Sequence, residues 1–167
     1  AGRGASSFLM MPIGTGISVA LMLGDNLWSG ATFSAGEVGH APVFPGGESC
    51  RCGSRGCLEV YASAKGIARR YEQATGEAGI GTDPVATEVW NTAVRALALS
   101  LTHMTLTVDV ERIIIGGGLS HAGENLLAPL REEFASMLTF RDAPEIVRAS
   151  LGGAGGRWGA AILAARV

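Results

Sequence analysis

All three cysteines of this 167-residue chain fall within eight residues, inside the stretch GHAPVFPGGESCRCGSRGCLE at 39–59. One of the three histidines precedes them, so the pattern reads His40-x9-Cys50-x-Cys52-x4-Cys57. A disulfide framework explains this poorly, because the cysteine count is odd and two cysteines are separated by a single residue. Three thiolates and one imidazole can instead close a tetrahedral Cys3His site, which suits zinc.

The predicted metal is structural, since four protein ligands leave no open position for a catalytic water. The alternative is three buried, reduced cysteines beside an unrelated histidine, but a polar, glycine-rich loop offers few apolar neighbours to bury them. Two carboxylates, Glu37 and Glu59, flank the cluster. They are either solvated groups that support the metal site or polar groups that a zinc-ordered loop presents to a ligand.

Composition excludes several classes of protein. Hydrophobic residues make up 47% of the chain, which fits one folded domain or half of a two-lobed protein. The net charge is −2 with no basic block, which argues against nucleic-acid binding. No apolar run reaches about 18 residues, so no membrane span is expected. The N-terminus does not resemble a signal peptide, and a cytoplasmic location is therefore expected.

The pattern of apolar residues predicts an α/β fold. Strands are expected over 7–13 and 17–23, over 112–118 where the strand runs into a glycine turn, and over 145–150. Helices are expected over 58–76, 84–108, 124–138 and 155–167, with a loop from 28 to about 57. The last helix is expected to pack through its small residues. Arg69 and Arg70 are interpreted as ordinary solvated helix charges.

Two glycine turns follow predicted strands, Gly14-Thr15-Gly16 and Gly116-Gly117-Gly118. Such turns can cradle phosphate, because free backbone N–H groups point at the anion. Each turn alone is more often only a turn. Two of them beside a zinc loop with carboxylates favour a site for a nucleotide and a second substrate.

These residues resemble one family closely. GEVGH at 36–40, followed by CRCGSRGCLE at 50–59, resembles the signature of the ROK family, which comprises repressors, open reading frames and sugar kinases. IGTGI at 13–17 resembles the family's second phosphate motif, and IIIGGGLSHAG at 113–123 its adenosine motif. WGAAILA at 158–164 resembles its closing helix, so the resemblance covers nearly the whole chain.

The resemblance implies an actin-like, ribonuclease-H-like fold of two lobes. Residues 1–167 look like a single C-terminal lobe with the zinc loop inserted at 39–59. The N-terminal lobe, with the first phosphate motif and the catalytic Asp, is expected upstream, so no catalytic residue is assigned here and the isolated lobe is expected to be inactive. The complete protein is expected to be a homodimeric, glucokinase-like hexose kinase that uses ATP and Mg²⁺.

Family roles carry over by position. The resemblance assigns zinc to His40, Cys50, Cys52 and Cys57. It assigns the hydroxyls of a hexose or amino sugar to Glu37, His40 and Glu59, so that His40 would serve both sites. It assigns the nucleotide to Gly14, Thr15, Gly16, Gly117 and Gly118.

One departure keeps a second function open. Glucokinases of the family often read G-T-G-I-G-G-G, whereas this chain continues after Gly16 with Ile17-Ser18-Val19-Ala20. The bulkier turn leans toward the effector-binding domain of a sugar-responsive transcriptional repressor, which would carry a DNA-binding domain upstream. A zinc-stabilised interaction module that binds no sugar is a third possibility.

Overall fold

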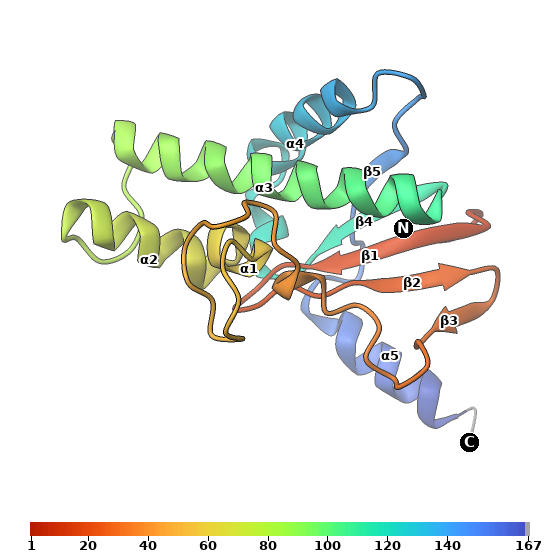
Figure 1. Cartoon of the computed structure of the whole chain (residues 1–167). Coiled ribbons are helices and arrows are strands. Elements are labelled where there is room, and N and C mark those ends of the chain that lie inside the picture. The colour runs from red at the N-terminus through yellow and green to blue at the C-terminus, as the bar shows by residue number, and fades with distance from the viewer. Residues whose placement is uncertain (166–167) are drawn as a thin grey trace.

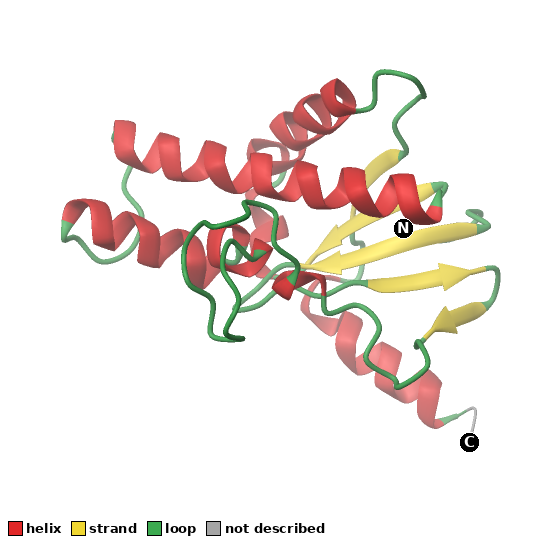
Figure 2. Ribbon diagram, in the orientation of Figure 1, coloured by secondary structure: helices red, strands yellow, loops and turns green. Residues whose placement is uncertain are grey.

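The computed structural model describes residues 1–165 and contains one five-stranded sheet in the order β3-β2-β1-β4-β5 (Figures 1 and 2). The central strand β1 pairs antiparallel with β2 and parallel with β4, and β2 with β3 is antiparallel whereas β4 with β5 is parallel. The strands are β1 Ser7–Pro12, β2 Ala20–Leu23, β3 Asn26–Trp28, β4 Arg112–Gly116 and β5 Glu145–Arg148.

Helices α3 and α4 pack together on one side of the sheet, and α1 and α2 lie beside α3 (Figure 1). The short α5 lies on the opposite side. The α-helices are α1 Leu58–Ala62, α2 Ala64–Thr75, α3 Pro84–Val108, α4 Glu124–Met137 and α5 Gly155–Ala164. Three short 3-10 helices are η1 Val38–His40, η2 Gly118–Ala122 and η3 Gly152–Ala154. Among the described residues, no helix combines the length and apolar character needed to cross a bilayer.

The long helix α3 forms where the sequence predicts it. The Asp83 side chain accepts a hydrogen bond from the Ala86 N–H at 3.0 Å, and Pro84 occupies the first turn, where its missing N–H costs nothing. The predicted apolar face is buried at its centre, with Leu97 and Leu101 fully inaccessible. These residues join Leu9, Met11 and Ile113 of the sheet in the core, which fixes α3 across the strands.

The predicted helix over 58–76 is wrong as a single element. Ser63 has extended backbone angles, ends α1, and caps α2 by accepting a hydrogen bond from the Gly66 N–H at 2.9 Å. A serine favours this position because its hydroxyl satisfies a free N–H of the next helix. The break separates α1 from α2, although both helices pack against α3, and α1 also contacts η1.

Other expectations need smaller corrections. The strand expected over 17–23 is shorter, because Ile17 pairs with Ile13 only in an isolated bridge and residues 18–19 lie outside any strand. The exposed strand β3 was not expected. The last helix does not pack as expected: none of its described residues is buried, and Trp158 is 60% exposed. Residues 166–167 of that predicted helix lie outside the described residues.

Candidate functional site

The loop between η1 and α1 is held by its own backbone. Val43 and Phe44 donate their N–H groups to the Gly56 carbonyl at 2.9 and 3.1 Å, and Gly56 donates to Glu48 at 2.8 Å. Gly56 has a φ of 77°, and a Cβ there would collide with the Phe44 carbonyl oxygen. Only glycine fits both demands, so the sequence shapes this loop even without a metal.

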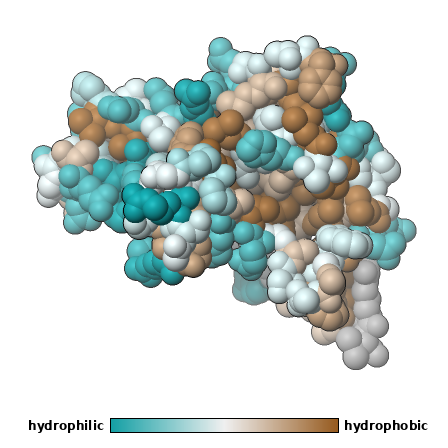
Figure 3. Space-filling model, in the orientation of Figure 1, coloured by the Kyte–Doolittle hydropathy of each residue, from teal (hydrophilic) through white to brown (hydrophobic). Residues whose placement is uncertain are grey.

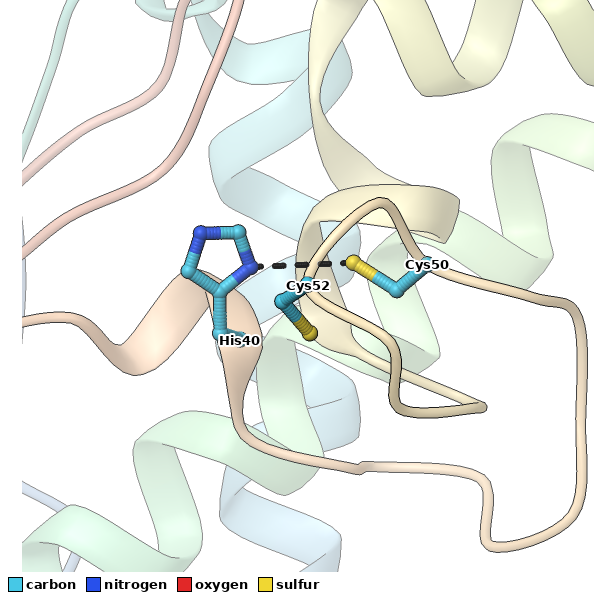
Figure 4. Close-up of side chains that lie close together, drawn as sticks. All are labelled: His40, Cys50 and Cys52. Carbon is cyan, nitrogen blue, oxygen red and sulfur yellow. Dashed lines mark hydrogen bonds between the residues drawn. The ribbon is translucent and has the colours of Figure 1, made fainter.

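Three of the predicted ligands come together at one end of the loop. The ligand atoms of His40, Cys50 and Cys52 all lie within 4.8 Å of one another, and Nδ1 of His40 is 3.6 Å from Sγ of Cys50 (Figure 4). The other ring nitrogen of His40 points away from the cysteines (Figure 4). This group could hold a metal ion while leaving the second ring nitrogen of His40 free.

The fourth predicted ligand, Cys57, lies outside that set of three. Its Sγ is 3.7 Å from Sγ of Cys52, and its thiol donates to the His40 carbonyl at 3.2 Å. Zinc–ligand bonds of about 2.3 Å to sulfur and about 2.0 Å to nitrogen imply tetrahedron edges of about 3.8 Å between sulfurs and about 3.5 Å between sulfur and nitrogen. The Cys52–Cys57 and Cys50–His40 distances match these edges, although only His40, Cys50 and Cys52 have ligand atoms that all lie within 4.8 Å of one another. The structure therefore brings together a His/Cys/Cys group that could hold a metal ion, with Cys57 beside it.

The thiols differ in their acidity without a metal. Burial raises the pKa of Cys57 to about 12, helped by the neighbouring Cys50 and Cys52. A backbone hydrogen bond from Ser54 and a hydrogen bond with Cys50 lower the pKa of the exposed Cys52. Because a metal binds thiolates, metal binding would have to release the Cys57 proton.

The Glu59 carboxylate is fixed against two glycines. It lies in the first turn of α1, and its Oε2 accepts a hydrogen bond from the Ile17 N–H at 3.2 Å. A Cβ on Gly16 would lie 2.7 Å from that oxygen, and one on Gly39 would collide with the Ile17 carbonyl. The glycines of the turn after β1 and of the GEVGH motif therefore let three segments approach one carboxylate.

Glu37 and His40 share the short helix η1. Glu37 precedes its first residue and His40 ends it, and both side chains are exposed. Gly39 lies between them and contacts the Ile17 turn. The structure thus places Glu37, His40 and Glu59 on neighbouring segments at the end of the sheet, and His40 also belongs to the group with Cys50 and Cys52.

The two predicted phosphate turns also lie side by side. Pro12 pairs with Gly116 across β1 and β4, whose carboxyl ends therefore reach the same edge. Ile13 donates its N–H to Gly116 at 2.9 Å, and Leu119 donates to the Ile13 carbonyl at 3.0 Å. Gly14, Thr15 and Gly16 thus adjoin Gly117 and Gly118, although about a hundred residues separate them in sequence.

Gly117 is required by packing and Gly118 is not. Gly117 has a φ of 75°, and a Cβ there would lie against the backbone of Ile13. Gly118 is exposed, and a Cβ there would meet nothing within 4 Å. Gly118 begins η2 after the turn that follows β4, and without a side chain it leaves the backbone there accessible to a ligand.

Arg69 and Arg70 are not ordinary solvated charges, which corrects the sequence interpretation. Both donate to Glu48, from Arg69 Nη2 at 2.8 Å and from Arg70 Nε at 2.7 Å. The Glu48 N–H in turn donates to the Tyr61 hydroxyl at 2.8 Å. The pair anchors the loop to α2, a link that helix periodicity could not reveal because Glu48 lies in an irregular segment.

Comparison with known proteins identifies the family. The sequence model described as the ROK family matches residues 1–167. The chain is 32% identical to a glucokinase of Halalkalibacterium halodurans over 95% of this chain and 57% of the relative. It is 34% identical to a glucokinase of Thermotoga maritima, covering 90% and 56%. The chain belongs to the ROK family.

Solved ROK structures match the fold described above. A ROK hexokinase from Thermus thermophilus superposes with a TM-score of 0.90 and 30% identity, covering 96% of this chain and 57% of that one. A ROK family glucokinase from Streptomyces griseus, in complex with glucose and AMPPNP, gives 0.87 and 32%, covering 98% and 62%. The mixed α/β sheet is therefore of the actin-like ATPase type.

The ROK chain spans about three fifths of the length of the curated relatives it matches, 57% of the first and 61% of a Streptomyces coelicolor glucokinase. A ROK family transcriptional regulator, homologous to the Escherichia coli MLC protein, has a TM-score of 0.70 at 22% identity and shows the shared fold alone. Relatives above 30% identity include proteins named as kinases of glucose, N-acetylgalactosamine, N-acetyl-D-glucosamine and kanosamine.

Proposed function

We propose that this ROK chain is the sugar- and nucleotide-binding lobe of an ATP-dependent hexose kinase of the glucokinase kind. The observation that carries the proposal is the junction of Glu59, Gly16 and Gly39, where a carboxylate is fixed next to a phosphate-type turn. Phosphoryl transfer to a sugar needs its hydroxyl and the phosphates held side by side.

Glu59 is suited to hold the sugar. Its Oε2 is occupied by the Ile17 N–H, which leaves the other carboxylate oxygen to accept a hydrogen bond from a sugar hydroxyl. A hydrogen bond to an ionised carboxylate is roughly twice as strong as one between neutral groups. Glu37 and the free ring nitrogen of His40 would add further partners for neighbouring hydroxyls.

Zinc would act on the sugar site through His40. Coordination at Nδ1 would fix the ring's tautomer and orientation, so that the other nitrogen always presents the same group to the sugar. Zinc would do no chemistry on the substrate in this arrangement. His40, Cys50, Cys52 and Cys57 are the residues proposed to hold it.

The nucleotide would lie over the edge where β1 and β4 end. Gly14, Thr15 and Gly16 are proposed to face the phosphates, and Gly117 and Gly118 to lie under the adenosine. Support comes from the pairing of the two turns and from the Streptomyces griseus relative, whose structure contains glucose and AMPPNP. Magnesium would accompany the nucleotide and neutralise charge during transfer.

The alternative, a sugar-responsive repressor, has weaker support. The departure from the glucokinase pattern lies at Ser18, Val19 and Ala20, since Ile17 matches that pattern. Val19 is partly buried against the core and donates its N–H to the Gly36 carbonyl at 2.8 Å, so its side chain serves packing. The relatives of at least 30% identity reported above are kinases, whereas the regulator is 22% identical. A homodimer in the cytoplasm is part of the proposal, and sedimentation of the complete protein tests its assembly.

The deciding experiment uses the complete protein with ATP, Mg²⁺ and a panel of glucose, mannose and N-acetylated hexosamines. Glu59→Gln keeps the size of the side chain and removes its charge, and the exposed Glu88→Gln on α3 is the matched control. Turnover of one sugar that is lost in Glu59→Gln and kept in Glu88→Gln supports the kinase. Sugar binding without turnover in the unmodified protein would instead establish the regulator.

A further inference from the structure

A cleft of about 150 Å³ opens between the zinc loop and the start of α2. One water molecule needs roughly a tenth of this volume, so the cleft has room for a small polyatomic ion. We propose that this cleft binds a compact oxyanion of the phosphate type next to Glu59. Its lining residues are Thr15, Ser49, Cys50, Arg51, Glu59, Val60, Ser63, Lys65, Gly66 and Arg69.

The charge of the lining favours an anion. Three basic side chains line the cleft, those of Arg51, Lys65 and Arg69. Glu59 is the one acidic side chain among the lining residues. Residues 48–70 hold five basic and two acidic side chains, although the whole chain carries a net charge of −2. Figure 3 shows a largely hydrophilic surface over this loop and helix. An excess of cationic side chains in a concave site attracts and concentrates anions.

Unused hydrogen-bond donors also reach this region. Within residues 1–165, Nε of Arg69 is buried without an acceptor, while its Nη2 is bound to Glu48. The Ser63 Oγ accepts from the Gly66 N–H, which leaves its own hydrogen free to donate. Lys65 is exposed in the first turn of α2, a twelve-residue helix whose N-terminus carries partial positive charge. Phosphate offers several acceptor oxygens for such donors.

The zinc loop places the third cation. Arg51 stands between Cys50 and Cys52, so the ligand cluster that orders these cysteines also fixes the backbone from which Arg51 extends. The cleft is bounded on its other side by Glu59, the residue proposed to hold the sugar. An anion bound here would therefore lie beside the sugar, either free or attached to it.

Two sources of the same chemistry are distinguished by the probes. Inorganic phosphate tests the binding of a free anion, and glucose 1-phosphate tests the binding of an anion attached to a sugar. Only the glucose 1-phosphate experiment rests on the proposed function. Both compounds are titrated calorimetrically into the complete protein, without nucleotide and at constant ionic strength. Lys65→Met and Arg51→Met remove the lining charges, and Arg95→Met on α3, 67% exposed and outside the cleft, is the matched control.

Lys65→Met and Arg51→Met are each expected to lower the binding affinity for at least one of the two phosphate compounds about tenfold. This is the size expected for the loss of one charge-assisted hydrogen bond. Arg95→Met is expected to change neither affinity. Equal effects of all three variants, or none, overturn the proposal. Glucose is titrated separately into Glu59→Gln. If glucose fails to bind the unmodified protein, the sugar site is wrong, whereas the inorganic phosphate result still decides the anion site.

Discussion

The Ile17 N–H donates to Oε2 of Glu59 at 3.2 Å, across 42 residues of sequence. This bond joins the turn that follows β1 to the first turn of α1. The turn proposed to face the phosphates and the carboxylate proposed to hold the sugar are therefore joined by one hydrogen bond. Any movement of the turn changes the direction in which Glu59 presents its second oxygen, so the two proposed substrates would meet at a single rigid junction.

Glu59→Gln is expected to weaken sugar binding by roughly 10- to 100-fold, because a hydrogen bond to a charged group contributes about 1.5–3 kcal/mol. The amide oxygen can still accept from Ile17, so the melting temperature is expected to stay within a few degrees of the parent. Calorimetric titration of glucose and a thermal melt measure both quantities. Unchanged affinity for glucose would remove Glu59 from the sugar site.

Gly117→Ala and Gly118→Ala form a matched pair of neighbours. An alanine at 117 meets the Ile13 backbone at a φ of 75°, so a loss of about 2–3 kcal/mol in the free energy of unfolding is expected. An alanine at 118 meets open space and is expected to change stability by less than about 0.5 kcal/mol. Urea denaturation measures both. Equal losses would contradict the packing role assigned to Gly117.

The cluster of His40, Cys50 and Cys52 was predictable because these residues are close in sequence, whereas its occupation by zinc stays a prediction. His40, Cys50 and Cys52 fall within thirteen residues, and closing so short a loop costs little conformational entropy. The strands and the long helix were predictable for a similar local reason, since apolar periodicity and the Asp83–Pro84 start signal act within a few residues.

The rest depends on contacts that sequence spacing does not encode. The pairing of Gly116 with Pro12 follows from strand order, and the Glu48 link to Arg69 and Arg70 joins an irregular loop to a helix. The break at Ser63 was missed because serine is tolerated inside a helix, and its capping role appears only when the chain turns there. The cationic cleft arises from the same tertiary contacts.

Metal removal is expected to loosen the loop at 39–59, since metal-binding energy becomes folding energy for the segment it closes. Trypsin should then cut faster after Arg51 and Arg55, whereas cleavage after Arg95 in α3 should change little. Cys52→Ser should lower the zinc content of the purified protein relative to the unmodified chain, because Cys52 is one of the proposed ligands. Identical digestion before and after verified zinc loss would mean that the loop's own hydrogen bonds suffice.

The contact of Tyr71 with Asp83 predicts a pH dependence at both extremes. The Tyr71 hydroxyl donates to Asp83, which lowers the pKa of Asp83 and raises the pKa of Tyr71. The Asp83 contribution to stability is full above the ordinary aspartate pKa of about 3.9 and is lost as the pH falls through the lower folded value.

The tyrosine behaves in the opposite sense. Its raised pKa contributes stability that is full below about pH 10 and is lost as the pH rises through the folded value. Tyr71→Phe should therefore flatten the pH dependence of the free energy of unfolding below pH 4 and above pH 10. Near neutrality the substitution should change this slope less. Urea midpoints across pH 2–11 measure this, with Tyr61→Phe as the control tyrosine. A slope that is the same in Tyr71→Phe and the parent at both extremes would show that the pair is not coupled to folding.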